Sequence, residues 1–201
     1  MRTKLEQQIV AFDNVMRKFF FEFQNKKKPK EYSEAQYRES CGQMRINHTG
    51  EVCAQALYAG HVNSKDDPNI KDWLKHAAEE EHRHLEWCAQ RLEELGARPS
   101  ALNPFFYAAS YVMAKALSSI SPKLNLAFIR ETERQVQEHL NAQLPHLTHD
   151  PVSCAIISKM IEDEAKHHDQ AAAFGGERLP LFSERLMHFA ATCMKKIVYY
   201  C

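Results

Sequence analysis

Two short motifs in the chain combine a carboxylate with an imidazole one helical turn away. Glu81-x-x-His84 and Glu164-x-x-His167 each place an oxygen ligand and a nitrogen ligand on the same side of a helix. Each pair interrupts a stripe of apolar residues that recurs every three or four positions, a spacing typical of the inner face of a packed helix. A buried, unpaired carboxylate is costly, so something must compensate for its charge. We therefore interpret the two pairs as candidate metal ligands.

Two further segments each carry one acid on an otherwise apolar helical stripe. Glu133 lies on a regular stripe, and Glu51 lies on a less regular one. By contrast, Glu79, His82 and Glu131 lie off these stripes. We expect them to be solvated or to point elsewhere, so they are not candidate ligands.

The acids and histidines occur in the order Glu, Glu-x-x-His, Glu, Glu-x-x-His, with nearly equal spacing in the two halves of the chain. This repeat predicts two helical hairpins packed as a four-helix bundle with the polar groups inside. Four carboxylates and two imidazoles in such a bundle are the ligand set of di-iron and di-manganese ferritin-like proteins. The oxygen-rich set argues against a structural zinc site, and manganese is an alternative to iron. The candidate ligands are Glu51, Glu81, His84, Glu133, Glu164 and His167.

Capping residues indicate where the ligand helices begin and end. Asp67 and Asp150 each precede a proline, which is a signal for an N-cap followed by the first helical residue. Gly96 and Gly175 are stop signals. Residues 31–42 are expected to connect to the first ligand helix. The ligand helices are expected to cover residues 43–63, 68–95, 124–145 and 151–174.

Residues 101–120 form the least polar segment of the chain, with Lys115 as its single charge. The segment lies between the two hairpins, so it must carry the chain from one end of the bundle to the other. A core helix and a helix that lies on a membrane or lines a channel for an apolar substrate fit it equally well. Further helices are expected at residues 3–24 and 181–201, and each fits packing on the bundle or a membrane or partner contact. The predicted fold is therefore all-α, with a crossover helix between two hairpins and additional N- and C-terminal helices.

Composition limits the classes of protein that the chain can represent. With 201 residues it can form one sizeable core, and we interpret residues 1–201 as a single domain with residues 1–40 as an N-terminal extension. The net charge of zero gives no basic field for nucleic acid. The 6 cysteines form no Cys-x-x-Cys pair, and the charged start lacks the features of a signal peptide. We therefore expect reduced thiols in the cytoplasm, and no stretch is apolar enough to span a bilayer.

Three longer motifs extend the candidate ligands: Arg45-Ile46-Asn47-His48-Thr49-Gly50-Glu51, Glu131-Thr132-Glu133 and Asp163-Glu164-x-x-His167-His168-Asp169. Together with the Glu81 motif they resemble the demethoxyubiquinone hydroxylases, the ferritin-like di-iron monooxygenases of ubiquinone biosynthesis. The resemblance covers roughly residues 40–201 and keeps the order and spacing of all six ligands. The Asn-His-x-Gly-Glu stretch distinguishes this family from ordinary ferritins and rubrerythrins.

The resemblance implies a cofactor, a reaction and a location. By resemblance the six ligands bind two iron ions, with Glu81 and Glu164 as bridges, and His139 lies near the metal and the substrate. The implied reaction adds one oxygen from O2 to the ring of a polyprenylated demethoxyubiquinol, with NADH as the reductant. The insoluble tail implies a peripheral position on the cytoplasmic side of the cell membrane. An oligomer and partners from a ubiquinone-biosynthesis complex are compatible with this function.

Some assignments stay open at the level of sequence. Asp163 and Asp169 either orient a ligand histidine or are surface charges. A ferritin- or rubrerythrin-like ferroxidase is the alternative function, but it predicts polar outer helices, and the apolar segment at residues 101–120 argues against it. A non-enzymatic membrane-associated protein with buried ion pairs is a third hypothesis. The repetition of the ligand set in both halves argues against that one.

Overall fold

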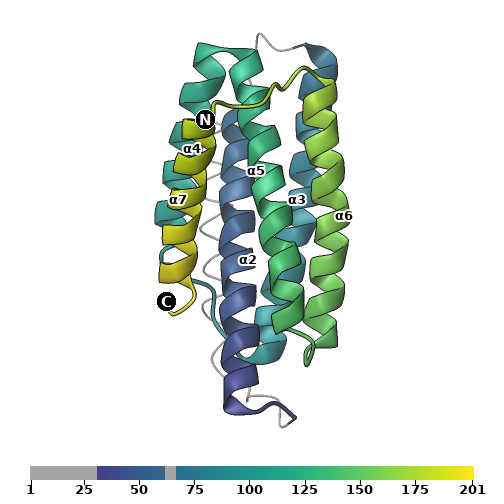
Figure 1. Ribbon diagram of the computed structural model, residues 1–201, viewed down its shortest axis with the longest axis vertical. Coiled ribbons are helices and arrows are strands. Elements are labelled where there is room, and N and C mark those ends of the chain that lie inside the picture. Colours follow the sequence, from purple (N-terminus) through teal and green to yellow (C-terminus); the bar gives the residue numbers. More distant parts are fainter. Residues whose placement is uncertain (1–30, 62–66) are drawn as a thin grey trace, which may run out of the picture.

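The computed structural model describes residues 31–61 and 67–201, and these residues form an α-helical bundle (Figure 1). The helix expected at residues 3–24 lies outside the described residues. A short 3-10 helix, Leu144–His146, directly follows the α-helix that ends at Gln143. The α-helices are α2 (Glu34–His61), α3 (Pro68–Leu95), α4 (Asn103–Ile120), α5 (Pro122–Gln143), α6 (Pro151–Ala173) and α7 (Leu181–Val198).

Two helical hairpins build the centre of the bundle. Helix α2 packs against α3 and α5 packs against α6, and the hairpins meet along the α3–α6 and α2–α5 seams. Helix α4 lies beside α2 and carries the chain from the end of the first hairpin to the start of the second, and α7 runs along the same side (Figure 1). The ferritin-like all-α fold, with its crossover helix and its C-terminal helix, is therefore confirmed.

Helix α2 begins well before the expected position, so the prediction of a connection at residues 31–42 is wrong. Ser33 Oγ accepts a hydrogen bond from the backbone N–H of Gln36 at 3.2 Å, and the Ser33 backbone N–H donates to Gln36 Oε1 at 3.0 Å. This reciprocal pair is a capping box, which satisfies two backbone donors at the helix start. Helix α5 ends at Gln143, earlier than expected, because Pro145 lacks the backbone N–H that would continue the helical hydrogen bonds. Helix α7 likewise ends at Val198 rather than at the last residue.

Helix α4 approaches α2 closely and leaves most of its own surface exposed. A Cβ atom at Gly60 would lie 2.8 Å from the Ala114 Cβ, so only glycine permits this approach without displacement. The buried residues of α4 are Asn103, Ala114 and Ser118. The segment is therefore an outer helix with a narrow contact stripe, not a core helix. None of the described helices is long and apolar enough to cross a membrane.

Two apolar clusters lie above and below the middle of the bundle, and the polar stripe residues lie between them. Along α3, Trp73 and Leu74 belong to the upper cluster and Leu92 and Leu95 belong to the lower one. The same order holds along α2, α5 and α6. Because each helix contributes apolar residues on both sides of its inward acid, the acids are held in one enclosed layer. The buried members of the lower cluster include Met44, Cys88, Leu92, Leu140, Ile157 and Met160, and those of the upper cluster include Tyr58, Leu74, Ala77, Leu126, Ile129 and Ala171.

Candidate metal centre

The structure brings all six candidate ligands together in the polar layer. They form two overlapping groups, and within each group one ligand atom from every residue lies within 4.8 Å of the others. Glu81 and Glu164 belong to both groups. All six side chains are buried. The two groups are Glu51, Glu81, His84 and Glu164, and Glu81, Glu133, Glu164 and His167.

Both histidines turn Nδ1 towards the carboxylates. His84 Nδ1 lies 3.4 Å from Glu81 Oε2 and 3.4 Å from Glu164 Oε1. His167 Nδ1 lies 3.0 Å from Glu81 Oε1 and 3.5 Å from Glu164 Oε2. Each shared glutamate therefore directs one oxygen to each histidine, which is the arrangement that bridging two metal ions requires.

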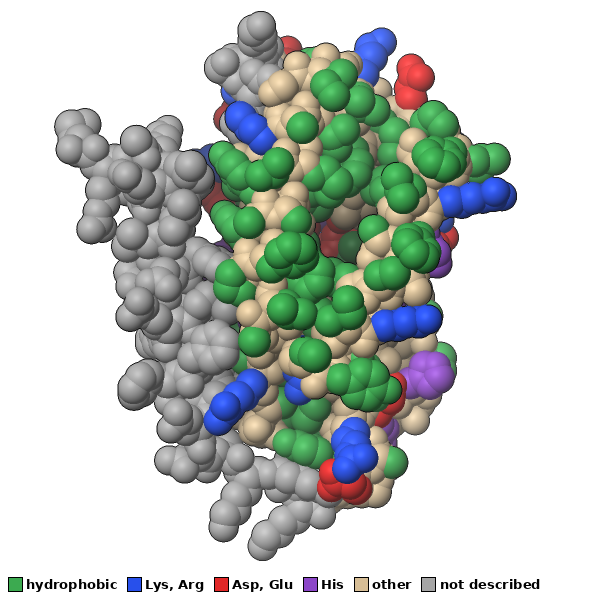
Figure 2. All heavy atoms as spheres, turned by 90° about the vertical axis from the view of Figure 1, so that its left-hand side faces the viewer, with side chains coloured by type: hydrophobic (Ala, Val, Ile, Leu, Met, Phe, Trp, Pro, Cys, Tyr) green, Lys and Arg blue, Asp and Glu red, His purple; other side chains and the backbone are tan. Residues whose placement is uncertain are grey.

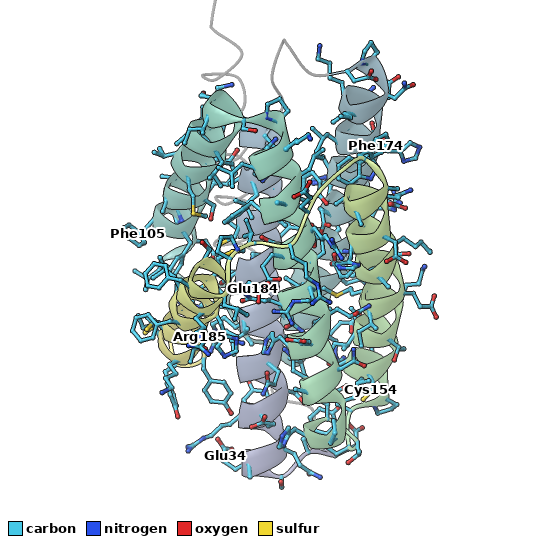
Figure 3. All side chains as sticks on the ribbon, turned by 45° about the horizontal axis from the view of Figure 1, so that its top comes forward. Glu34, Phe105, Cys154, Phe174, Glu184 and Arg185 are labelled. Atoms are coloured by element: carbon cyan, nitrogen blue, oxygen red, sulfur yellow. The ribbon has the colours of Figure 1, made fainter. Side chains whose placement is uncertain are left out.

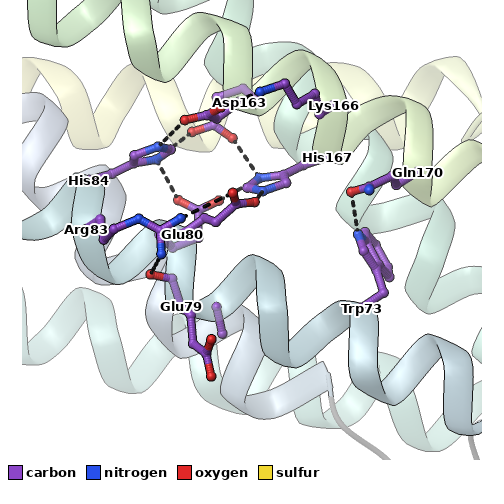
Figure 4. A network of polar contacts seen from close by, with 12 residues as sticks. Trp73, Glu79, Glu80, Arg83, His84, Asp163, Lys166, His167 and Gln170 are labelled. Carbon is purple, nitrogen blue, oxygen red and sulfur yellow. Dashed lines mark hydrogen bonds and ion pairs between the residues drawn. The ribbon is translucent and has the colours of Figure 1, made fainter.

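The outer nitrogen of each histidine contacts an acid from the opposite hairpin (Figure 4). His84 Nε2 lies 3.4 Å from Asp163 Oδ2 on α6, and His167 Nε2 lies 2.9 Å from Glu80 Oε2 on α3. Lys159 and Lys166 each donate to Asp163 Oδ1 at 2.8 Å and so hold this carboxylate in place. Such partners fix the orientation of an imidazole and increase its basicity towards a metal.

Of the two aspartates left open by the sequence, the structure places only Asp163 against a candidate ligand. Asp169 contacts the neighbouring His168 at 3.0 Å and is exposed, so it is a surface charge. Glu80 was not singled out from the sequence. The available signal was its position directly before Glu81, which matches the position of Asp163 before Glu164.

A buried tyrosine provides a hydrogen-bond donor to the ligand group that contains Glu133 and His167. Tyr58 Oη donates to Glu133 Oε1 at 2.8 Å, and its ring packs edge-on beside His167. Burial and the charge of Glu133 raise the pKa of Tyr58 well above its usual value. The phenol is therefore neutral at pH 7 and acts as a hydrogen-bond donor to this carboxylate.

The cluster holds protons when no metal is bound. Burial, followed by the charges of neighbouring carboxylates, raises the pKa of Glu51 and of Glu133 well above the usual range. Burial opposes the charged form of the histidines, but the adjacent carboxylates of Glu164 and Glu81 favour that form and outweigh the effect of burial. They raise the pKa of His84 to about 10 and that of His167 to about 12. The charge balance of the layer therefore depends on bound protons, which a metal would displace.

The donor atoms of this layer fit a pair of metal ions. Glu51 Oε2, both carboxylate oxygens of Glu81, His84 Nδ1, Glu164 Oε2 and His167 Nδ1 are buried and lack a hydrogen-bond partner among the described residues. Unsatisfied buried polar atoms are rare in folded proteins and require an explanation. Carboxylate oxygens with one imidazole per group suit iron or manganese, and a ligand pair shared by both groups suits two ions.

The other residues singled out from the sequence lie outside both groups. His139 lies on α5, where its Nε2 is 2.7 Å from Gln143 Nε2, and burial, with the charge of Lys195, lowers its pKa to about 4. Glu79 and His82 are exposed, as expected. Glu131 is buried but pairs with Arg134 at 2.6 Å, so it points away from the layer.

Comparison with known proteins shows which family the chain is similar to. The family model of the ubiquinone biosynthesis protein COQ7 matches residues 38–198. A 3-demethoxyubiquinol 3-hydroxylase of Ralstonia pickettii (strain 12J) is 45% identical over 168 residues, which cover 83% of this chain and 77% of the relative. Hydroxylases of the same name are 43% identical over 168 residues in Francisella tularensis subsp. novicida (strain U112), covering 83% and 80% of the two chains. In Pseudomonas putida (strain W619) the identity is 44% over 170 residues, covering 84% and 79%.

Proposed function

The chain belongs to the COQ7 family of ubiquinone biosynthesis proteins, and we propose that it hydroxylates the ring of a polyprenylated demethoxyubiquinol at the described metal layer. The name of its relatives, 3-demethoxyubiquinol 3-hydroxylase, gives the substrate and the reaction. The single observation that carries the proposal is the pair of overlapping ligand groups that share Glu81 and Glu164. We propose that the chain forms one domain built around this layer.

Six side chains would hold two iron ions. Glu51 and His84 would complete the coordination of one ion, and Glu133 and His167 that of the other, with Glu81 and Glu164 shared. When bound, the iron pair supplies the electrons and the reactivity towards O2 that hydroxylation of the ring needs. Manganese is the alternative metal for this donor set.

The protein around the layer orients ligands and excludes water. Asp163 and Glu80 hold the outer nitrogens of the two histidines, so both Nδ1 atoms are directed inwards before metal arrives. Tyr58 Oη donates a hydrogen bond to Glu133. The upper and lower apolar clusters close the layer from both ends, which protects a reactive site from water.

The surface of α4 and α7 supports an encounter with a lipid-soluble substrate. Figure 2 shows hydrophobic side chains gathered over these two helices, with a hollow between them, and in Figure 3 Phe105 points away from the bundle. Burial of one large apolar side chain is worth about 1.5–3 kcal/mol, so several together can hold a protein on a bilayer. We propose a peripheral position on the cytoplasmic side of the cell membrane. The most exposed apolar residues of these helices are Phe105, Val112 and Ile120 on α4 and Leu181, Phe182 and Phe189 on α7.

The same surface separates this proposal from the alternative of an iron-storing ferroxidase, for which polar outer helices are expected. NADH is the proposed source of electrons, by resemblance to the family. An oligomer and protein partners of a biosynthetic complex are also compatible with an apolar outer face.

A product assay under labelled O2 tests the function. Iron-loaded protein, NADH and a short-tail demethoxyubiquinone are incubated under ¹⁸O2, and the quinone is analysed by mass spectrometry. One labelled oxygen in the product of the wild-type protein, and none with Glu164→Ala, is the expected result. Stoichiometric iron oxidation without oxygen transfer to the quinone would instead favour the ferroxidase.

A further inference from the structure

Two buried amides join α2 to α5 on the side of the lower cluster. Asn47 Nδ2 donates to Gln143 Oε1 at 2.9 Å, and Gln143 Nε2 donates to Asn47 Oδ1 at 2.7 Å. Both side chains are almost fully buried. In such a reciprocal pair, rotation of either amide breaks both hydrogen bonds, so each amide fixes the orientation of the other.

The second N–H of Gln143 is directed to a histidine. Gln143 Nε2 lies 2.7 Å from His139 Nε2. An amide nitrogen only donates, so the imidazole nitrogen must accept at this contact. Burial, helped by the nearby positive charge of Lys195, lowers the pKa of His139 to about 4, so the ring is neutral at pH 7. A neutral imidazole carries one proton, and with Nε2 as the acceptor that proton is on Nδ1.

The histidine lies on α5, which contacts α7. It is only half-buried, in contrast to the amides that hold it. Among the described residues its ring hydrogen-bonds through Nε2 alone. The positive charge of Lys195, on α7, contributes to the lowered pKa of His139. Nδ1 is therefore the ring atom left to meet a molecule that enters beside α7.

We propose that Asn47 and Gln143 are positioning residues that hold His139 in its neutral Nδ1–H form, so that it presents one hydrogen-bond donor to a ring oxygen of the substrate. The part that concerns the substrate rests on the proposed function, and the part that concerns the tautomer does not. Because the neutral imidazole carries no charge, its Nδ1–H can donate a hydrogen bond to a quinol oxygen or to a quinone carbonyl. If the two amides only hold α2 against α5, substitutions in them should change neither the tautomer of His139 nor the affinity for the substrate.

Nitrogen NMR tests the tautomer without any turnover. The full chain is labelled with ¹⁵N-histidine, loaded with diamagnetic zinc, and the His139 ring signals are assigned by their loss in His139→Gln. We expect Nε2 at the shift of an unprotonated nitrogen and Nδ1 at that of a protonated one. In Gln143→Glu the carboxylate can only accept, so Nε2 must become protonated. A protonated Nε2 in the wild-type protein, or an unchanged tautomer in Gln143→Glu, would overturn the proposal.

Kinetics test the substrate contact, with Asn141→Asp as the matched control. Asn141 lies on the same helix, is exposed and donates to the backbone of Gln137, so the control adds the same charge outside the amide pair. We expect Gln143→Glu to lower kcat/KM for the quinol about 10- to 100-fold, mainly through KM, at unchanged iron content. An unchanged kcat/KM together with a changed tautomer would remove the substrate role. If the wild-type protein does not hydroxylate the quinol, the proposed function fails while the NMR result stands.

Discussion

Glu80 Oε2 lies 2.9 Å from His167 Nε2, so the residue directly before one Glu-x-x-His motif contacts the histidine of the other. The reverse contact joins Asp163, directly before the second motif, to His84 at 3.4 Å. Each hairpin therefore orients a ligand of its partner. This crossed arrangement couples the packing of α3 on α6 to the geometry of the metal layer.

Removal of an acid that contacts the outer nitrogen of a histidine is expected to weaken metal binding, although all six candidate ligands remain. In Glu80→Ala the His167 ring loses the partner that fixes its orientation, so affinity for iron should fall about 10- to 100-fold. Competition with a coloured chelator measures the change. Glu79→Ala is the control, because Glu79 is exposed and faces away from the layer. Equal affinities of the two variants would show that the contact does not support the ligand.

Metal binding is expected to release protons, so affinity should rise with pH. The raised pKa values of Glu51, Glu133, His84 and His167 mean that the metal-free protein holds protons that its ligands must lose. Titration calorimetry with Mn²⁺ in buffers of different ionisation enthalpy gives the number released. Glu131→Gln should not alter it, because hydrogen bonds to Arg134 lower the pKa of Glu131 despite its burial. Zero release at pH 7 would contradict the account.

The two Asp-Pro helix starts look equivalent in the sequence but are expected to differ in stability. Asp67 is an exposed cap that accepts from the Asn69 backbone at 2.8 Å. Asp150 is fully buried and also binds Arg91 at 2.8 Å. Asp67→Ala should cost about 1 kcal/mol of unfolding free energy. Asp150→Ala removes the buried acid partner of Arg91, which then keeps only the exposed Glu94 as an acid partner, and should cost about 3–5 kcal/mol. Urea unfolding compares them, and equal losses would be the contrary result.

The exposed face of α7 is expected to determine binding to lipid. The double variant Phe182→Asp/Phe189→Asp should reduce cosedimentation with phosphatidylcholine vesicles at least about tenfold, because each ring contributes roughly 1.5–3 kcal/mol when buried. Both side chains are exposed, so the thermal midpoint should not change. Val152→Asp changes an exposed apolar residue on α6 and serves as the control. Equal vesicle binding by all three proteins would contradict the membrane role of α7.

Helical periodicity was sufficient to select the six candidate ligands that the structure brings together in one buried layer. Glu81 and His84 stand out because a polar pair on an apolar stripe needs a partner, and the same argument applies to Glu133 and Glu164. The fold followed from the repetition of these pairs. The start of α2 was missed, although Ser33 and Gln36 carry a recognisable capping signal.

The contacts that surround the layer were not predictable from one sequence. Glu80 lies off the inner stripe of α3. Its contact with His167 exists only because α6 packs beside α3. The Asn47–Gln143 pair and the Asp150–Arg91 ion pair join residues far apart in the chain. Periodicity reports which face of a helix is inward, but it carries no information on which residue of another helix lies opposite.

The occupancy of the layer is the most direct test of the central claim. Crystals of iron-loaded protein, measured at the iron absorption edge, give the position of each ion independently of any assay. We expect two anomalous peaks per chain, one in contact with Glu51 and His84 and the other with Glu133 and His167, with Glu81 and Glu164 touching both. A single peak, or iron bound elsewhere on the bundle, would contradict the account.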